Sequence, residues 1–352
     1  MATTQRRAVT VFDRVGIFKI ERCCATGLRI ENSVAESGMN PERLQHLLQA
    51  AKGRRLLVIG DVMLDVVTKI SVLPSQINYG SDTAAKVSTH GGGAGGNVAA
   101  WLRIAGAQSH MLARIGKDAA GVAVRSEFDR LGVSYSEIDV HGTPTGIVVV
   151  IVDKDGERSM FPDNGANSGL TLADLPELKS FNAAYISGYA LLDPKSRAGI
   201  LQMIGKIKAA GLKIYLDPAT VGGMTGVPIA EIRAWINQVH CLLLNEDETK
   251  YLSSTTDLEL AIADLLQICP TIVVKRGSHG VIAANRGSAS ISLPAISAQV
   301  IDTTGAGDSF AAGFIAADQA GLDFTQSLGA ALTIAAKCVA IVGARPALDA
   351  QV

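Results

Sequence analysis

Residues 300–314 read V-I-D-T-T-G-A-G-D-S-F-A-A-G-F. The glycine-rich motif T-G-A-G-D lies between an apolar run and the segment A-A-G-F-I-A-A. This order predicts a glycine-rich turn that leads into a buried helix. The backbone N–H groups of Gly305, Ala306 and Gly307 then lack partners within the helix, and the helix dipole favours negative charge there. The stretch therefore predicts an anion site.

Asp308 lies in the same helical turn, where a carboxylate would repel a phosphate unless it had a separate role. A hydroxyl that attacks a γ-phosphate must lose its proton while negative charge is stabilised nearby. We therefore expect Asp308 to be a base. The alternative is a first-turn helix residue that the dipole favours.

The motif D-T-T-G-A-G-D-S-F-A-A-G-F resembles the C-terminal signature of the ribokinase-like (PfkB) family of carbohydrate and nucleoside kinases. It is not a Walker P-loop, because no G-K-[ST] follows the glycines. The resemblance implies that the backbone of Gly305, Ala306 and Gly307 forms the anion hole and that Asp308 is the catalytic base.

Composition is consistent with one large α/β domain and an appendage, since 48% of the 352 residues are hydrophobic and 18% are charged. A net charge of −1 gives no electrostatic footprint for nucleic acid or for an anionic membrane. The apolar stretches are broken before 18 residues, so no membrane span is expected. Five cysteines without C-x-x-C spacing argue against zinc and disulfides and favour a cytoplasmic setting.

The chain divides into four segments. Residues 1–39 are expected to form a loosely ordered, basic extension without a secretory signal. Residues 40–54 begin N-P-E-R-L, with an Asn cap and Pro at the first helical position, and predict a short helix. Residues 55–346 form the predicted kinase domain, and residues 347–352 form a tail.

From residue 55 onward, apolar strands alternate with helical stretches and end in polar residues or glycine, as in R-L-L-V-I-G-D and T-I-V-V-K-R-G. This pattern predicts a doubly wound, mostly parallel sheet flanked by helices, a ribokinase-like fold. Asp61 and Asp65 follow the first strand, at the edge where such sheets bind ligands. The resemblance implies that Asp65 holds sugar hydroxyls, and a solvated turn carboxylate is the alternative.

Residues 66–90 and 145–163 alternate polar and apolar side chains and predict a small sheet, the second segment as a hairpin. They resemble the lid of the family, which would exclude water from the reaction. Edge strands of this lid suggest a homodimer. We expect Arg158 to be an exposed hairpin arginine, with contact to a charged substrate group as the alternative.

Five glycines lie among residues 91–96, so we expect the backbone to approach a ligand closely before a helix starts near Asn97. The segment resembles the family's N-terminal signature, which implies that Gly92, Gly93 and Asn97 lie against the sugar. A dinucleotide site is less consistent with the pattern, because the glycines follow a polar strand instead of a buried one.

Two later motifs are candidates for nucleotide and metal binding. Asn245 and Glu248 match the family's N-x-x-E motif, whose oxygens suit Mg²⁺, and they also match a capped helix start. The two interpretations, a magnesium site and a helix cap, can both be true. K-R-G-S-H-G, with Lys275, Gly277 and Gly280, resembles the family's loop for ATP phosphate and ribose, with a strand-to-helix turn as the alternative.

The resemblance also implies a monovalent cation such as K⁺ beside the anion hole. It would be held by Asp302 and the carbonyl of Thr304, with further carbonyls near Gly343.

Three positions depart from ribokinase itself. Met63 replaces an asparagine, Ala94 replaces a lysine and Tyr189 replaces a glutamate, which removes groups that read a sugar. Tyr189 is expected either to stack on a sugar or base face or to pack in the core.

The sequence thus predicts an ATP-dependent kinase that phosphorylates a primary hydroxyl of a sugar. A nucleoside kinase and a heptose-phosphate kinase of the same family are alternatives. A non-catalytic sugar- or nucleotide-binding regulator is another. The intact Asp308 and anion hole argue against the regulator, which would need neither.

Overall fold

The computed structural model describes residues 9–13, 16–21, 29–30 and 49–346. Within the expected extension, strands β1 (Val9–Asp13), β2 (Gly16–Glu21) and β3 (Arg29–Ile30) pair antiparallel in the order β1-β2-β3. Most of the helix expected over residues 40–54 lies outside the described residues, although residues 49–51 are helical. The tail at 347–352 also lies outside them.

A large sheet forms the centre of the body, in the order β16-β15-β14-β13-β12-β11-β4-β7-β8. Strands β4 to β14 of this sheet run parallel, and at one edge β15 pairs antiparallel with both β14 and β16. The strands are β4 (Arg55–Ile59), β7 (Gln108–Leu112), β8 (Ser134–Tyr135), β11 (Ala183–Ser187), β12 (Lys213–Asp217), β13 (Cys241–Asn245), β14 (Thr271–Lys275), β15 (Val281–Asn285) and β16 (Ile291–Leu293).

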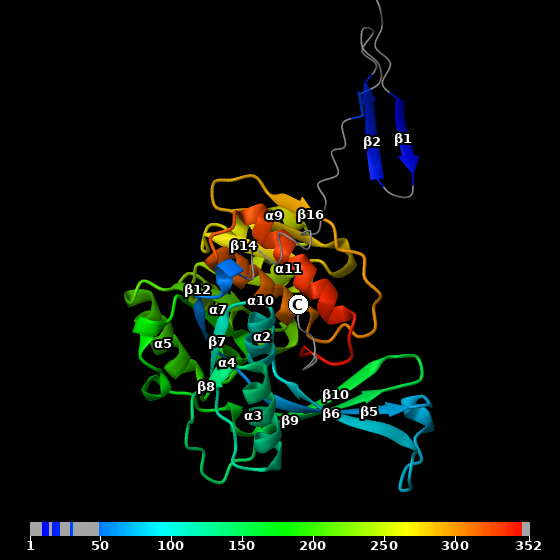
Figure 1. The fold of residues 1–352 in the computed structure, drawn as a ribbon, viewed down its shortest axis with the longest axis vertical. Coiled ribbons are helices and arrows are strands. Elements are labelled where there is room, and N and C mark those ends of the chain that lie inside the picture. The colour runs from blue at the N-terminus through cyan, green and yellow to red at the C-terminus, as the bar shows by residue number, and fades with distance from the viewer. Residues whose placement is uncertain (1–8, 14–15, 22–28, 31–48, 347–352) are drawn as a thin grey trace, which may run out of the picture.

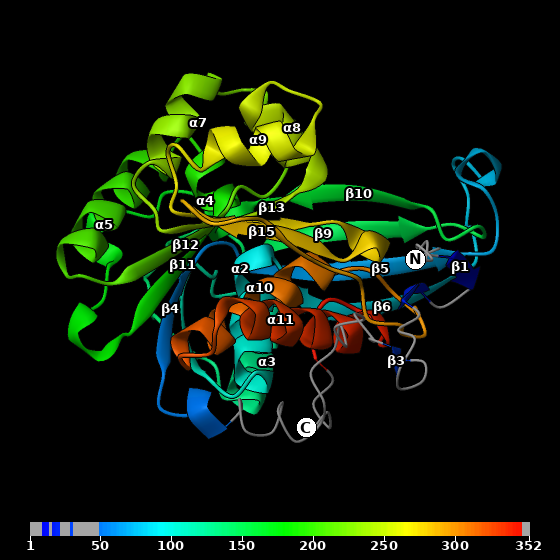
Figure 2. The same ribbon diagram turned by 90° about the horizontal axis from the view of Figure 1, so that it is seen from above.

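Helices cover both faces of this sheet, as Figure 2 shows. One face carries α2 (Ala94–Ile104), α3 (Ala119–Leu131), α10 (Ala306–Gln319) and α11 (Phe324–Val339). The other carries α5 (Arg197–Ala209), α7 (Ile229–Ile236), α8 (Glu246–Ser253) and α9 (Leu258–Leu265). Shorter helical turns are α4 (Gly188–Leu192), α6 (Val221–Met224), η1 (Pro74–Gln76), η2 (Gly165–Asn167), η3 (Leu172–Asp174), η4 (Leu178–Ser180) and η5 (Gly277–His279).

The apolar strands supply both cores because successive side chains point to opposite faces. In β4, Leu56 and Val58 belong to the core under α2 and α10, whereas Leu57 and Ile59 belong to the core under α5 and α7. All four are fully buried. The doubly wound sheet flanked by helices that the sequence predicts is therefore confirmed.

A second sheet projects from the body at the lower right of Figure 1, in the order β10-β9-β5-β6. Its strands are β5 (Met63–Ile70), β6 (Ala85–Gly92), β9 (Gly146–Val152) and β10 (Arg158–Asp163). β9 and β10 form an antiparallel hairpin, while β5 and β9 pair in parallel. We call this sheet the lid. Among the helices that the structure describes, none has the length and apolar content to cross a membrane.

Candidate active site

A cleft of about 1270 Å³ lies between the lid and the carboxyl-terminal edge of the large sheet. Lid side chains such as Val148 and Met160 form one wall, and the start of α10 lies in the other. The predicted site residues that line it are Asp65, Gly93, Asn97, Tyr189, Asn245, Glu248, Lys275, Gly277, Gly280, Thr304, Gly305, Ala306, Gly307 and Asp308. Gly92 and Asp302 are not among the lining residues.

Parallel strands bring the polar residues of the cleft together. Ser187 is in register with Asp217 at the ends of β11 and β12, and Asn245 is in register with Lys275 at the ends of β13 and β14. Chain order reverses between β4 and β11, and open α/β sheets bind ligands at such a point.

The predicted anion site lies at the start of α10. Gly305 caps the helix with φ 77°, and a Cβ there would lie 2.5 Å from the carbonyl oxygen of Ala344. A side chain at this position would therefore be strained and would clash. A Cβ on Gly307 would lie 3.4 Å from Nζ of Lys275, so the ammonium approaches the free amides of the helix start. Helix dipole and lysine charge favour an anion at the same place.

Asp308, in the first turn of α10, accepts a hydrogen bond of 2.8 Å from Nδ2 of Asn97 on α2. Burial, together with the nearby Asp217 carboxylate, raises the pKa of Asp308 to about 7, against the lowering effects of Asn97 and Lys275. A carboxyl group with a pKa near neutrality is suited to accept a proton during a reaction at neutral pH.

Lys275 and Asp217 form a mostly buried ion pair, with Nζ 2.5 Å from Oδ2. Burial acts to lower the pKa of Lys275, but the carboxylates of Asp217 and Glu248 outweigh it and raise the pKa above its usual value. The lysine therefore keeps its positive charge beside the start of α10.

Asn245 and Glu248 form the capping box that the sequence offered as one of two readings. The Asn245 side chain accepts from the Glu248 backbone N–H at 2.8 Å, and both oxygens of Glu248 accept from Asn245, at 2.9 and 2.7 Å. Burial and the Asp217 carboxylate raise the pKa of Glu248. Within the described residues, no group of three or more His, Cys, Asp or Glu side chains is arranged to hold a metal ion.

At the lid end of the cleft, Asp65 is 9% exposed. Burial raises its pKa to about 6, and Arg345 opposes this shift. A Cβ on Gly92 would lie 2.1 Å from Oδ1 of Asp65, so the glycine makes room for the carboxylate. Tyr189 on α4 is 45% exposed and lines the cleft, so the alternative that it packs in the core is wrong.

Arg345, which the sequence analysis missed, lies 5% exposed beneath the glycine-rich segment. Its Nη2 donates to the carbonyl of Gly92 at 2.6 Å, and its Nε donates to Oδ1 of Asn97 at 3.3 Å. Its Nη1 lies 3.4 Å from Glu127, and the guanidinium stacks 4.6 Å from the ring centre of Phe128. No spacing or periodicity marks an arginine 248 residues away from Asn97 as its partner.

Arg345 also corrects the interpretation of the glycine-rich segment. A Cβ on Gly91 or Gly96 would lie 2.0 or 2.3 Å from the Arg345 guanidinium, so these glycines make room for a protein side chain, not for a ligand. The helix begins at Ala94, earlier than the expected start near Asn97. The reason is Asp61, whose carboxylate accepts from the N–H groups at the helix start, from Ala94 at 2.9 Å.

Asp302 and Thr304 contact Arg158 of β10. The guanidinium donates to Oδ1 of Asp302 at 2.6 Å and to Oγ1 of Thr304, and the Gly343 N–H donates to Oδ2 of Asp302 at 3.1 Å. Arg158 is an exposed residue of the hairpin, as expected, but its side chain is ion-paired with Asp302. The Asp302 carboxylate, which was predicted to hold a monovalent cation, is therefore already paired with a positive group, and this pairing disfavours a second cation there.

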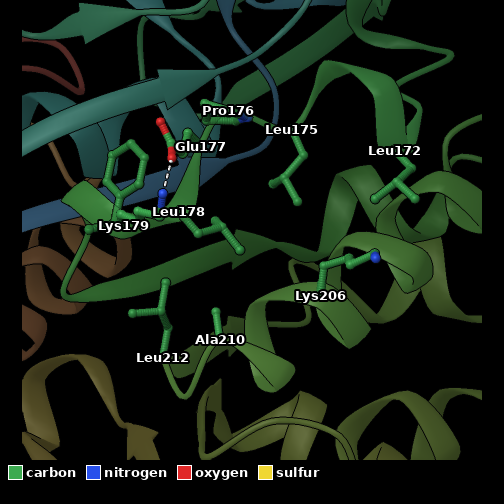
Figure 3. Close-up of a pocket in the computed structure, with 10 residues that line it drawn as sticks. Leu172, Leu175, Pro176, Glu177, Leu178, Lys179, Lys206, Ala210 and Leu212 are labelled. Atoms are coloured by element: carbon green, nitrogen blue, oxygen red, sulfur yellow. Dashed lines mark ion pairs between the residues drawn. The ribbon is translucent and has the colours of Figure 1, made fainter.

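A separate hollow of about 700 Å³ lies away from these residues (Figure 3). It is lined by apolar side chains such as Leu175 and Leu212, with an ion pair of 2.9 Å between Lys179 and Glu177 at its side. None of the predicted site residues lines it.

Comparison with known proteins identifies the class that this fold and cleft define. The model of the pfkB family carbohydrate kinases matches residues 54–351, and the chain belongs to that family. It is 31% identical to a ribokinase of Arabidopsis thaliana over 309 residues, 83% of this chain and 78% of that protein. It is 30% identical to a fructokinase of Klebsiella pneumoniae over 272 residues, 74% of this chain and 83% of that protein.

A solved structure of Arabidopsis thaliana ribokinase, complexed with ribose and ATP, has a TM-score of 0.69 and 28% identity. The match covers 83% of this chain and 94% of that chain. The family and enzyme class predicted from the sequence, carbohydrate kinases of the PfkB family, are confirmed.

Proposed function

We propose that the protein transfers the γ-phosphoryl group of ATP to a primary hydroxyl of a sugar, with Asp308 as the base. The observation that carries this proposal is the position of Asp308. It is a carboxyl group with a pKa of about 7 in the first turn of a helix whose free amides and neighbouring lysine favour an anion. The named relatives support the substrate class, since one of them is complexed with ribose and ATP.

In this proposal ATP lies along the carboxyl ends of β13 and β14. Gly277 and Gly280 approach the nucleotide, and Lys275 approaches its phosphates. The γ-phosphate lies at the start of α10, where backbone N–H groups of Gly305, Ala306 and Gly307 stabilise the charge on the transferring group.

Magnesium fits the oxygen donors at Asn245 and Glu248, because carboxylate and amide oxygens are its usual protein ligands. Burial and the Asp217 carboxylate raise the pKa of Glu248, and a bound cation would favour its charged form. When bound, Mg²⁺ would neutralise part of the phosphate charge.

The acceptor lies under the lid, where Asp65 accepts from its hydroxyls. The same space is lined by Gly93, Asn97 and Tyr189. Gly92 has no side chain and so leaves room for the Asp65 carboxylate. The acceptor oxygen attacks the γ-phosphorus, its proton passes to Asp308, and the bond to the bridging oxygen breaks to release ADP. Asn97 holds the Asp308 carboxylate in orientation through its hydrogen bond.

A nucleoside acceptor is the second candidate, because the lid end of the cleft offers apolar surface. Tyr189 is 45% exposed and Met160 is 57% exposed, and both line the cleft. An aromatic ring exposed in a cleft is suited to stack on a base. The homodimer through the lid and the cytoplasmic setting stay predictions.

The experiment is ADP release with Mg-ATP across a panel of pentoses, hexoses, sugar phosphates and nucleosides, with Asp308→Asn as the control. Acceptor-dependent release that falls by about a thousandfold or more in the variant supports the proposal and identifies the acceptor class. If wild-type and variant release ADP at the same rate with every acceptor, Asp308 is not the base.

A further inference from the structure

We propose that the guanidinium of Arg158, a lid residue, takes the place of a monovalent cation beside the anion hole, so that the kinase reaction needs no K⁺. The inference rests on the proposed function for its activity readout. It rests on the contacts of Asp302 and Thr304 for its structural basis.

The Arg158 side chain spans from the lid to the segment that leads into α10. It donates to Oδ1 of Asp302 at 2.6 Å and to the Thr304 hydroxyl. The Asp302 side chain is 16% exposed. It is held in place by the backbone N–H groups of Thr304 at 2.8 Å and Gly343 at 3.1 Å. The carboxylate that would bind an ion is therefore fixed, and its charge is already paired.

Electrostatics explains why one positive group is needed and why two do not fit. Asp302 stands three residues before the Gly305 cap, and an uncompensated carboxylate there would repel the phosphate that the anion hole binds. A guanidinium neutralises it, and its planar fork reaches a carboxylate and a hydroxyl together. A K⁺ ion on the same carboxylate would lie within a few ångströms of Arg158 and be repelled by it.

Arg158 differs from a bound ion because its positive charge is covalently attached to the lid. A positive charge on the lid is present at an effective concentration that does not depend on salt in the medium. It also links the lid to the anion hole, because the same side chain belongs to β10 and contacts the residues before α10. Lys154, on the turn of the same hairpin, pairs instead with its neighbour Asp155 at 2.7 Å and serves as a matched control.

The test compares wild-type, Arg158→Met and Lys154→Met proteins in KCl and in choline chloride at equal ionic strength. We expect the wild-type and Lys154→Met proteins to turn over at rates within about twofold in the two salts. We expect Arg158→Met to be slower by about tenfold or more in choline and to recover at least part of that loss in KCl. A wild-type rate that rises about tenfold with K⁺ overturns the proposal, and so does an Arg158→Met protein that is unimpaired in choline or not rescued by K⁺.

Melting temperatures of the same proteins in the two salts test cation binding without relying on enzyme activity. Arg158→Met should melt higher in KCl than in choline chloride, because the ion binds only the folded site, whereas the wild type should not. If no acceptor supports turnover, the proposed function fails while the melts still test the cation site. If Arg158→Met does not fold, the wild-type comparison still decides, since K⁺-dependent stabilisation of the wild type would refute the inference.

Discussion

The substitution Asp308→Asn should inactivate the enzyme and at the same time stabilise its fold. It removes a negative charge, while the amide oxygen can still accept the hydrogen bond from Asn97. Burial raises the pKa of Asp308 from 3.8 to about 7, so the native state holds the proton more tightly than the unfolded chain does. Stability is therefore greatest at low pH and falls as the pH rises from about 4 to about 7.

The size of the effect follows from the shift. About three pKa units at about 1.4 kcal/mol each set a ceiling of about 4 kcal/mol above pH 7. Asp308 keeps partial contact with solvent, so screening lowers the expected gain to about 1–3 kcal/mol at pH 8. At pH 5 less than half of the shift has been expressed, so the advantage of the variant should be smaller there.

Urea unfolding of both proteins at pH 5 and pH 8 measures this difference, and the pH dependence of wild-type kcat/KM measures the same proton. The rate should fall about tenfold per pH unit below pH 7, because a protonated carboxyl cannot accept the hydroxyl proton. A variant that is less stable than wild type at pH 8 would refute the reasoning, since Asp308 would then contribute favourable interactions in its charged form. A wild-type rate that stays flat down to pH 5 would refute the pKa.

Three further substitutions test the acceptor end of the cleft. Gly92→Ala should raise KM for the acceptor by about tenfold and leave KM for ATP within about twofold, in steady-state kinetics, because the new Cβ would displace Asp65. Arg345→Met should lower the free energy of unfolding by about 3–5 kcal/mol in urea, because it leaves the Glu127 carboxylate without its buried partner; a loss below about 1 kcal/mol would contradict the pairing. Tyr189→Ala should change stability by less than about 1 kcal/mol, since the ring is exposed, but should weaken acceptor binding about tenfold in a titration.

Local patterns explain why the fold was predictable from the sequence. Buried parallel strands are continuous apolar runs, and their ends carry the polar residues Asp217, Asn245 and Lys275, so position along the chain places them at one edge. The contacts of Arg345 and Arg158 were not predictable in the same way. Arg158 and Asp302 lie 144 residues apart, and neither periodicity nor spacing records which charged side chains meet after folding.

The glycine-rich segment also shows what cannot be predicted from the sequence alone. The sequence predicts that Gly91 and Gly96 give close backbone approach, and the structure agrees that a side chain would not fit at either position. What approaches is the Arg345 guanidinium, not a ligand. A glycine pattern reports that space is needed, and only the fold identifies the group that fills it.

The polar side chains at the lid end of the cleft limit how the acceptor can be recognised. Asn167 donates to the carbonyl of Val62 at 2.9 Å and accepts from its N–H at 2.8 Å, so both ends of its amide are engaged by the protein. The Asn97 side chain donates a hydrogen bond to Asp308, and the Asp61 carboxylate accepts from the N–H groups at the start of α2. These groups are therefore also engaged by the protein.

Within the described residues the Asp65 carboxylate accepts no hydrogen bond, so it is available to read an acceptor hydroxyl. The hydroxyls of Tyr189 and Tyr185, on rings that line the same cleft, are further candidates, and the Tyr185 hydroxyl is buried without a hydrogen-bond partner in the described part of the chain. Met63 and Ala94 supply no charge, so we expect the site to discriminate between acceptors largely by shape and apolar contact. Acceptors that differ by one hydroxyl far from Asp65 should therefore differ in kcat/KM by less than about tenfold, whereas loss of the hydroxyl that meets Asp65 should reduce it by more.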